Sequence, residues 1–160
     1  VLAPAKLNKN IITKARRIAV DCVKAVKGYG LFGVEMFYTK DGRILVNEMA
    51  PRPHNSGHYT IEGCVTSQFE NHVRAVLGLP LGSAEMVNPA AVMINLLGKT
   101  NKSGEVKNYK NALSDEDIHL HIYGKRSSRI GRKMGHITIT GGNANVILKK
   151  AKAAEKKIVI

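Results

Sequence analysis

The sequence contains no tryptophan, and only 5% of its residues are aromatic. Proteins that bind single-stranded nucleic acid stack bases on aromatic side chains, so this composition argues against that class. The two cysteines, Cys22 and Cys64, are too few for a disulfide framework, which predicts free thiols in a cytoplasmic protein. No apolar run reaches the roughly 20 residues that cross a bilayer, and no signal peptide is recognisable, so no membrane association is expected.

Acidic residues are also scarce, since 12 Asp and Glu stand against 25 Lys and Arg, for a formal net charge of +13. Such an excess predicts an anionic partner, which could be nucleic acid, a phosphorylated metabolite or an acidic neighbouring domain. Hydrophobic residues make up 44% of the chain, enough to form a core. The length allows one domain or two small ones.

The chain does contain a succession of helical and strand-like patterns. Apolar residues at helical spacing over 8–27 predict an amphipathic helix that ends at Gly28. Ser67 with Glu70 forms a capping box that opens a second helix. The second half of the chain predicts three short strands and a final helix, over residues 91–97, 118–123, 136–140 and about 145–157.

The stretch GVEMFYTKDGRILVNEM predicts a β-hairpin, because Asp41-Gly42 stands between two runs rich in β-formers. Taking those two residues as the loop gives three cross-strand pairs: Lys40 with Arg43, Phe37 with Val46, and Glu35 with Glu48. The two carboxylates would then face each other with Cβ atoms roughly 5 Å apart, and their repulsion must be offset by a proton, a basic group or a divalent cation. Two carboxylates suit magnesium. A solvated hairpin face with nearby lysines is the alternative.

Residues 50–60, APRPHNSGHYT, predict an irregular loop, because prolines and Asn-Ser-Gly disfavour regular structure. Loops on rigid scaffolds concentrate binding groups, so we expect function here. A connector whose side chains bond its own backbone is the alternative. The spacing of His54 and His58 would suit zinc only on a helix, which this sequence does not favour. The loop carries a dense polar set: Arg52, His54, Asn55, Ser56 and His58.

A second loop, GKRSSRIGRKMG over residues 124–135, is basic and contains glycines. Arginine and lysine side chains at such spacing can hold a phosphate. Charge alone favours an ordinary solvated loop instead. The cations concerned are Lys125, Arg129, Arg132 and Lys133.

Taken together, five segments resemble the 5-(carboxyamino)imidazole ribonucleotide synthases of purine biosynthesis, an ATP-grasp family: GLFGVEMF, LVNEMAPRPHNSGHYTIEGCVTSQFENHVRAVLGLPLG, AVMINLLG, HIYGK and GRKMGH. The resemblance covers nearly the whole chain. It implies an α+β fold, in which the C-terminal half of an ATP-grasp domain, an antiparallel sheet with helices, occupies residues 1–87. A small β-rich domain with a terminal helix would follow over 88–160.

The family implies an enzyme that uses ATP and Mg²⁺ to convert aminoimidazole ribonucleotide and bicarbonate to 5-(carboxyamino)imidazole ribonucleotide. ATP phosphorylates bicarbonate to carboxyphosphate, and the exocyclic amine of the nucleotide is then carboxylated. In fungi this module resembles the first part of a phosphoribosylaminoimidazole carboxylase. We expect a cytoplasmic homo-oligomer that binds neither nucleic acid nor membranes.

By motif position, the resemblance also implies roles for individual residues. Glu35 and Glu48 would bind the metal, and Asn47 with Glu48 would line the ATP pocket. The position two residues after the second glutamate, an asparagine ligand in many ATP-grasp enzymes, is Ala50. Three loop residues would be catalytic, namely Arg52, His54 and Asn55. The substrate would be bound by Arg52, His54, Lys125, Arg132 and Lys133.

The same resemblance implies a missing N-terminal half, which would carry a substrate-binding domain and a glycine-rich lid. The 160-residue chain is therefore expected not to turn over by itself. Another ATP-grasp ligase or carboxylase with the same hairpin is the alternative among enzymes. A basic nucleic-acid-binding module is the alternative outside enzymes, and it leaves the opposed glutamates unexplained.

Overall fold

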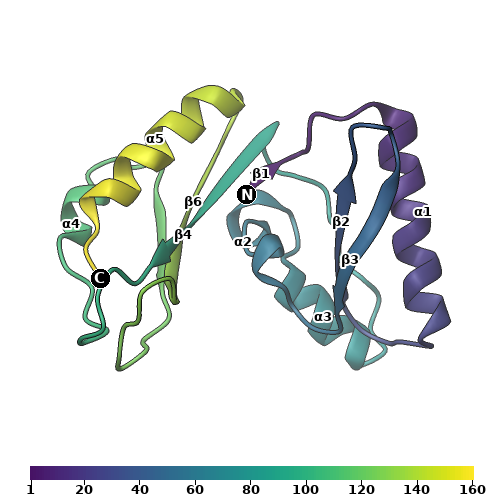
Figure 1. Ribbon diagram of the computed structural model, residues 1–160, viewed down its shortest axis with the longest axis horizontal. Coiled ribbons are helices and arrows are strands. Elements are labelled where there is room, and N and C mark those ends of the chain that lie inside the picture. Colours follow the sequence, from purple (N-terminus) through teal and green to yellow (C-terminus); the bar gives the residue numbers. More distant parts are fainter.

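The computed structural model describes residues 1–160 and contains two separate antiparallel sheets with helices beside them (Figure 1). One sheet is the hairpin β2–β3, and the other has four strands in the order β1-β4-β6-β5. This mixture confirms the predicted α+β class. The strands are β1 (Leu2–Ala3), β2 (Gly33–Tyr38), β3 (Ile44–Ala50), β4 (Ala90–Leu97), β5 (His119–Ile122) and β6 (Lys133–Gly141). The helices are α1 (Lys9–Ala25), η1 (Asn55–Gly57), α2 (Thr60–Gly63), α3 (Gln68–Val76), α4 (Tyr109–Ala112) and α5 (Ala144–Lys157).

The main core lies between the four-stranded sheet and helix α5, which covers one face of β4 and β6 (Figure 1). Ile137 and Ile139 of β6 are completely buried there, and α5 contributes Ile147 and Ala151. Strands β4 and β6 are each paired on both sides, and β4 is apolar except for Asn95, whereas β6 alternates isoleucines with His136, Thr138 and Thr140. On the opposite face, a Cβ added to Gly63 of α2 would stand 3.1 Å from the Cβ of Ala91, so α2 lies directly on β4.

The first residues of the chain pack with the second half of the sequence rather than with α1 and the hairpin that follow them. Strand β1 pairs antiparallel with β4, with Leu2 opposite Val92 and Ala3 opposite Ala91. The first residues therefore complete the sheet of the second half before the chain turns into α1. The division between two domains at residue 87 stays a prediction.

The predicted strands and the two later helices are confirmed, with small shifts at their ends. Half of the predicted capping box forms at the start of α3, where the Oγ of Ser67 accepts from the amide of Glu70 at 3.2 Å. The Glu70 carboxylate instead pairs with Arg74 at 2.6 Å. Helix α1 ends earlier than predicted, at Ala25, and the left-handed residue that follows is Lys27 with φ 50° rather than Gly28. A third short helix, α4, lies in a region where no helix was predicted.

The hairpin forms, but its predicted two-residue loop is wrong. The loop contains Lys40, Asp41 and Gly42, because Thr39 and Arg43 close it through backbone and side-chain hydrogen bonds. The positive φ expected of the turn falls on Gly42 alone, at 81°. The longer loop shifts the register by one residue, so the observed pairs near it are Tyr38 with Ile44, Phe37 with Leu45 and Met36 with Val46.

The predicted pairing of Glu35 with Glu48 is nevertheless confirmed. A β-bulge at Asn47 inserts one extra residue into β3, between the partners of Met36 and Glu35. This extra residue compensates the extra loop residue, and the original register returns. Two irregularities that the sequence pattern did not reveal therefore cancel at the glutamate pair.

The prediction that residues 50–60 are irregular is only partly right. The chain makes a 3₁₀ turn at η1, where the amides of Gly57 and His58 donate to the carbonyls of His54 and Asn55. Helix α2 then begins at Thr60. His54 itself stays extended, with φ −112° and ψ 148°, so the backbone turns immediately after this side chain.

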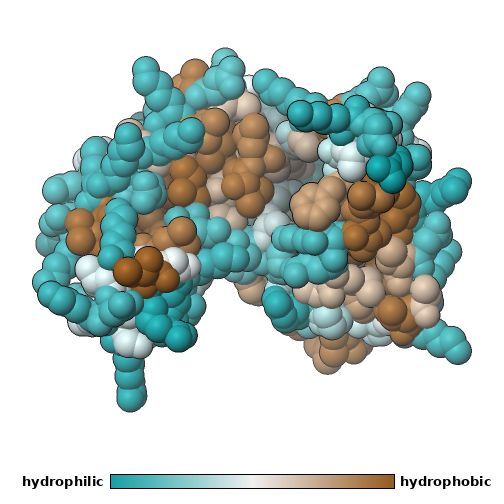
Figure 2. Space-filling model, in the orientation of Figure 1, coloured by the Kyte–Doolittle hydropathy of each residue, from teal (hydrophilic) through white to brown (hydrophobic).

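The hairpin and α1 carry much exposed apolar surface. Helix α1 is amphipathic, yet none of its residues is buried. Phe37, Tyr38, Leu45 and Val46 of the hairpin are each more than 40% exposed, and hydrophobic side chains show on the surface of both halves in Figure 2. Exposed apolar patches of this kind commonly mark surfaces that contact other protein. None of the helices combines the length and apolar character that crossing a lipid bilayer requires.

Candidate functional site

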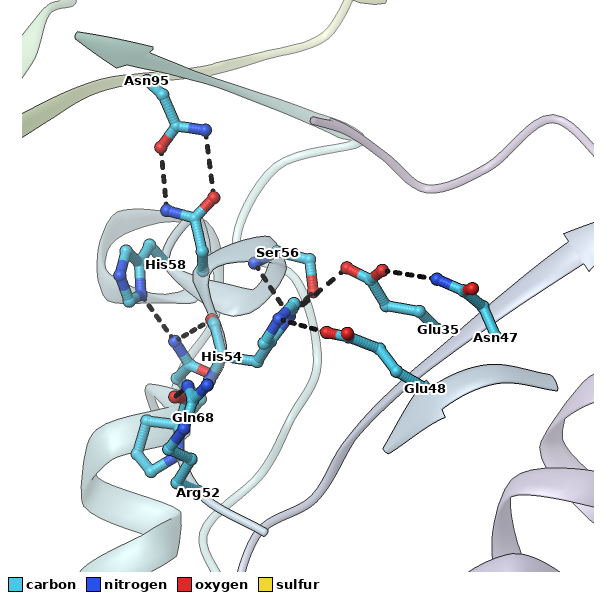
Figure 3. Close-up of polar contacts among 11 residues, drawn as sticks. Glu35, Asn47, Glu48, Arg52, His54, Ser56, His58, Gln68 and Asn95 are labelled. Carbon is cyan, nitrogen blue, oxygen red and sulfur yellow. Dashed lines mark hydrogen bonds and ion pairs between the residues drawn. The ribbon is translucent and has the colours of Figure 1, made fainter. Parts of the chain in front are cut away.

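The centre of the candidate site is the opposed pair Glu35 and Glu48 with His54 beside it (Figure 3). The Nδ1 of His54 lies 3.7 Å from an oxygen of Glu35, and its Nε2 lies 3.5 Å from an oxygen of Glu48. One ligand atom from each of the three residues falls within 4.8 Å of the others. The predicted metal ligands and one predicted catalytic residue therefore come together in space.

The electrostatics of this cluster leave negative charge uncompensated. The side chains of Glu35 and Glu48 are 41% and 56% exposed, and the one basic group within 4 Å of either is His54. Like charges placed directly opposite on a sheet destabilise it. The predicted alternative, a solvated face paired with lysines, is not what the structure has, because no lysine or arginine forms an ion pair with either carboxylate.

The bulge at Asn47 adds a fourth polar group. With one extra residue in β3, both Asn47 and Glu48 stand opposite Glu35. The Nδ2 of Asn47 donates to Glu35 at 3.4 Å. This side chain, predicted to line an ATP pocket, thus lies at the edge of the carboxylate pair.

Backbone and side-chain contacts hold His54 in place. Its side chain is 12% exposed, and its Nδ1 lies 2.8 Å from the Oγ of Ser56. Gln68 at the start of α3 accepts from the His54 amide at 3.0 Å and donates to the His54 carbonyl at 2.9 Å. The imidazole is therefore part of a well-supported turn rather than a mobile loop.

Asn55 connects the loop to the second sheet. Its amide side chain exchanges two hydrogen bonds with Asn95 of β4, at 2.8 and 3.0 Å (Figure 3). Asn95 was not predicted as a site residue, although it is the one polar residue of the otherwise apolar strand β4 and could have been noticed for that reason. This pair brings the PRPHNSGH loop against the four-stranded sheet.

Arg52, predicted to be catalytic, does not join the glutamate cluster. Its side chain is exposed and donates only to the adjacent carbonyl of Pro53, at 3.2 Å. In Figure 3 it points away from the carboxylates. It therefore lies on the rim of the site.

The basic loop brings its predicted cations close together. Lys125 Nζ donates to the carbonyl of Lys133 at 2.6 Å and lies 5.5 Å from the centre of the Tyr123 ring. Arg132 donates to the carbonyl and hydroxyl of Ser127. Burial lowers the pKa of Lys125, and the charges of Arg132 and its neighbours lower it further. The charged neighbours that shift this pKa are all cations, so the loop has unneutralised positive charge.

A histidine cluster around the buried His136 links the two halves of the site and was missed by sequence reasoning. His136 of β6 stacks on His121 of β5 with ring centres 4.4 Å apart, and its other neighbour, His58, lies at 5.2 Å. The hydroxyl of Tyr123 lies 2.9 Å from its Nδ1. Burial is the main cause that lowers the pKa of His136 to about 4. The motifs HIYGK and GRKMGH contain these residues, but a single sequence does not show that they meet.

Comparison with known proteins finds two matching families, one for each half of the chain. Residues 1–69 match the family described as the ATP-grasp domain, and residues 91–150 match the phosphoribosylaminoimidazole carboxylase C-terminal domain. The phosphoribosylaminoimidazole carboxylase of Ogataea methanolica is 50% identical over 143 residues, which cover 87% of this chain and 26% of that protein. The chain thus spans about a quarter of the length of this relative.

Solved structures show the same similarity. The N5-carboxyaminoimidazole ribonucleotide synthetase from Thermotoga maritima has a TM-score of 0.90 and 50% identity, covering 99% of this chain and 44% of that one. The synthase from Aspergillus clavatus, in complex with ADP and 5-aminoimidazole ribonucleotide, has a TM-score of 0.86 and 39% identity, covering 97% and 42%.

The fold around the opposed glutamates is that of part of an ATP-grasp domain, followed by a phosphoribosylaminoimidazole carboxylase C-terminal domain. Over nearly its whole length, the chain is similar to one part of the N5-carboxyaminoimidazole ribonucleotide synthases and phosphoribosylaminoimidazole carboxylases.

Proposed function

We propose that the chain forms part of an ATP- and Mg²⁺-dependent ligase that carboxylates aminoimidazole ribonucleotide with bicarbonate. The observation that carries the proposal is the pairing of Glu35 with Glu48 and the position of His54 between their carboxylates. The complex of the Aspergillus clavatus neighbour with ADP and 5-aminoimidazole ribonucleotide supports the classes of nucleotide and substrate. A cytoplasmic location and homo-oligomeric assembly belong to the same proposal.

The residues present fit a magnesium ion. Mg²⁺ is typically bound by one or two carboxylates and fills its other positions with water and substrate phosphates. Glu35 and Glu48 would supply the two carboxylates, and Ala50 offers no side-chain ligand. When bound, the ion would neutralise charge on the ATP phosphates during phosphoryl transfer. Asn47 and Glu48 would contact the ATP side of the site.

The loop residues would face the reacting substrates. His54 is held by its backbone and by Ser56, so its ring has a defined orientation before substrate binds. Two hydrogen bonds to Asn95 hold the side-chain amide of Asn55, so this group would have a defined orientation toward a substrate. Arg52 makes a single hydrogen bond to a neighbouring carbonyl, so its guanidinium can reorient toward an anionic substrate at little cost.

The basic loop would bind the ribose phosphate of the substrate. Lys125 and Arg132 each donate to a backbone carbonyl, which orients the side chains before a phosphate arrives. Lys133 follows Arg132 directly at the start of β6. Because these cations lack a carboxylate partner, an anion would gain charge-assisted hydrogen bonds without breaking an existing ion pair.

The test is ATP hydrolysis by the intact native gene product. We expect hydrolysis to require Mg²⁺ and to be stimulated by aminoimidazole ribonucleotide and bicarbonate together. Hydrolysis that ignores the imidazole nucleotide would indicate another ATP-grasp ligase and refute the proposed substrate. Absence of hydrolysis, combined with nucleic-acid affinity that falls steeply with salt, would favour the basic binding module instead.

The 160-residue chain alone is not expected to turn over. It spans about a quarter of the length of its Ogataea methanolica relative, and its hairpin and α1 expose apolar surface. Measurable carboxylation by the purified chain would contradict this expectation.

A further inference from the structure

Gln68, the first residue of α3, makes an unusual set of contacts for a helix-start residue. Its side chain is 7% exposed and reaches back to the turn that follows His54. Its Oε1 accepts from the His54 amide at 3.0 Å, and its Nε2 donates to the His54 carbonyl at 2.9 Å. The same Nε2 lies 2.8 Å from the Nδ1 of His58. One buried carboxamide thus binds both backbone groups of a single residue.

The chemistry of these partners fixes the orientation of the carboxamide. A backbone N–H can only donate, so the atom facing the His54 amide must be the oxygen. A backbone carbonyl can only accept, so the other atom must be the nitrogen. The second hydrogen of that nitrogen is then available to His58, whose Nδ1 must accept it and therefore carries no proton. Burial lowers the pKa of His58, which agrees with a neutral ring.

The turn is shaped around this side chain. A Cβ added to Gly57 would stand 2.4 Å from the Oε1 of Gln68, so a larger residue there would displace the carboxamide from its present position. The Oγ1 of Thr60 accepts from the Gln68 amide at 2.9 Å and donates to the Gly57 carbonyl at 2.6 Å. The backbone of the loop and the start of α3 are therefore bonded into one unit.

We propose that Gln68 is a positioning residue for the reaction, which holds the His54 imidazole against the glutamate pair. The ring nitrogens lie 3.5 and 3.7 Å from the two carboxylates, so small movements of the His54 backbone would change both distances. Glutamate has the same shape, but an ionised carboxylate cannot donate to the His54 carbonyl and would place a charge in a buried position. A carboxamide is therefore required. This inference rests on the proposed function.

The same helix provides a matched control. Asn71 accepts from the Gly82 amide at 2.8 Å and donates to the Gly82 carbonyl at 3.2 Å. It therefore holds a loop in the way that Gln68 does, but the loop is the one after α3 and contains none of the proposed site residues. If replacing either residue lowers activity only by destabilising the fold, alanine at Gln68 and alanine at Asn71 should both lower kcat. If Gln68 positions His54, only the change at Gln68 should lower kcat.

The experiment compares Gln68→Ala, Gln68→Glu and Asn71→Ala in the intact native gene product. Steady-state kinetics with ATP, bicarbonate and aminoimidazole ribonucleotide are measured beside the hydrogen exchange of the His54 amide. We expect kcat to fall about 10- to 100-fold in both Gln68 variants, because small misplacements of reacting groups cost that much. His54 exchange should accelerate in Gln68→Ala. Asn71→Ala should keep kcat within about twofold of wild type and His54 exchange unchanged.

Wild-type kcat in either Gln68 variant, or equal losses of kcat in Gln68→Ala and Asn71→Ala, would overturn the inference. If Gln68→Ala does not fold, the isosteric Gln68→Glu is compared with Asn71→Ala instead, and wild-type kcat in Gln68→Glu would overturn the inference. A wild-type protein without nucleotide-stimulated hydrolysis would refute the proposed function instead. In that case, His54 exchange that is unchanged in Gln68→Ala would also show that Gln68 does not hold the loop.

Discussion

At the scale of single residues, the pairing of Glu35 with Glu48 lowers the stability of the hairpin while providing two carboxylates for the proposed metal site. Two carboxylates opposite each other repel, and a hairpin without a catalytic task would have no reason to keep both. His54 lies within 4 Å of both carboxylates, but its ring carries a positive charge that could reduce their repulsion only when it is protonated. The proposed Mg²⁺ would offset this repulsion when it binds.

Replacing either glutamate by glutamine should separate the two effects. In the intact protein, Glu35→Gln and Glu48→Gln should each lower kcat about 100-fold or more, because an electrostatic contact to developing charge is lost. Each should also stabilise the hairpin slightly, by about 0.2–1 kcal/mol, because one like-charge pair is removed. ATP hydrolysis and calorimetric titration with Mg²⁺ and ATP measure the first effect.

Glu116→Gln is the control, because this exposed residue lies far from the hairpin in sequence and in the fold. It should leave both hydrolysis and metal binding unchanged. Normal Mg²⁺-dependent turnover in Glu35→Gln would remove the glutamate pair from the proposed site.

Lys125 makes a different prediction, which concerns binding rather than turnover. Lys125→Ala should raise the KM for aminoimidazole ribonucleotide by about tenfold or more, since a charge-assisted hydrogen bond to phosphate is lost. The kcat at saturating substrate should change little. Lys110→Ala removes an exposed lysine outside the loop and should leave the KM unchanged. A normal KM in Lys125→Ala would contradict phosphate binding by Lys125 and would favour an ordinary solvated loop, as charge alone suggested.

At the scale of elements, the hairpin shows what a local pattern can predict. Asp-Gly between β-forming runs located the turn, but the loop has three residues, and only Gly42 has positive φ. The bulge at Asn47 depends on contacts across the strand pair, so no local pattern announces it. The glutamate pairing was predicted correctly although the register between it and the turn was wrong.

Gly42→Ala should destabilise the hairpin by about 1 kcal/mol. A Cβ at this position would meet nothing within 4 Å, so the cost comes from the backbone conformation at φ 81° and not from a clash. Gly142→Ala is the matched control, because its Cβ also meets nothing and its φ is not in the left-handed region. Hydrogen exchange of the β2 and β3 amides in the intact protein measures the change. Equal exchange in the two variants would contradict the assigned turn.

At the scale of the whole molecule, half-buried polar groups connect the segment that follows the hairpin to the four-stranded sheet. Glu62 of α2 lies 2.6 Å from the Nε2 of His121 in β5. Asn55 and Asn95 form the second connection. The carboxylate pair and the basic loop belong to different sheets, so these contacts set the distance between the proposed metal and phosphate sites.

His136 makes the stability of this region depend on pH. Its pKa is about 4 in the folded protein, against about 6.5 in an unfolded chain, so the unfolded state binds the proton more readily. Stability should therefore be complete above pH 6.5 and fall as the pH drops toward 4, by on the order of 3 kcal/mol. Native-state hydrogen exchange of the β4 and β6 amides, corrected for intrinsic rates, measures this loss.

His136→Gln should flatten the pH dependence, because the titrating group is gone. His119→Gln, which removes an exposed histidine of the same sheet, should not. An unchanged pH profile in His136→Gln would assign the acid sensitivity to other groups.

The sequence by itself determined the strands and helices, the hairpin, the Ser67 N-cap and the opposed glutamates, because periodicity, turn chemistry and capping act between residues close in the chain. The α+β class followed from the motif resemblance. The motif resemblance added the family, which the comparisons support. Only the tertiary structure showed that Gln68 hydrogen-bonds to the backbone of His54, that Asn55 pairs with Asn95 and that His136 is buried. Such contacts join residues 14 to 40 positions apart, and only packing brings them together.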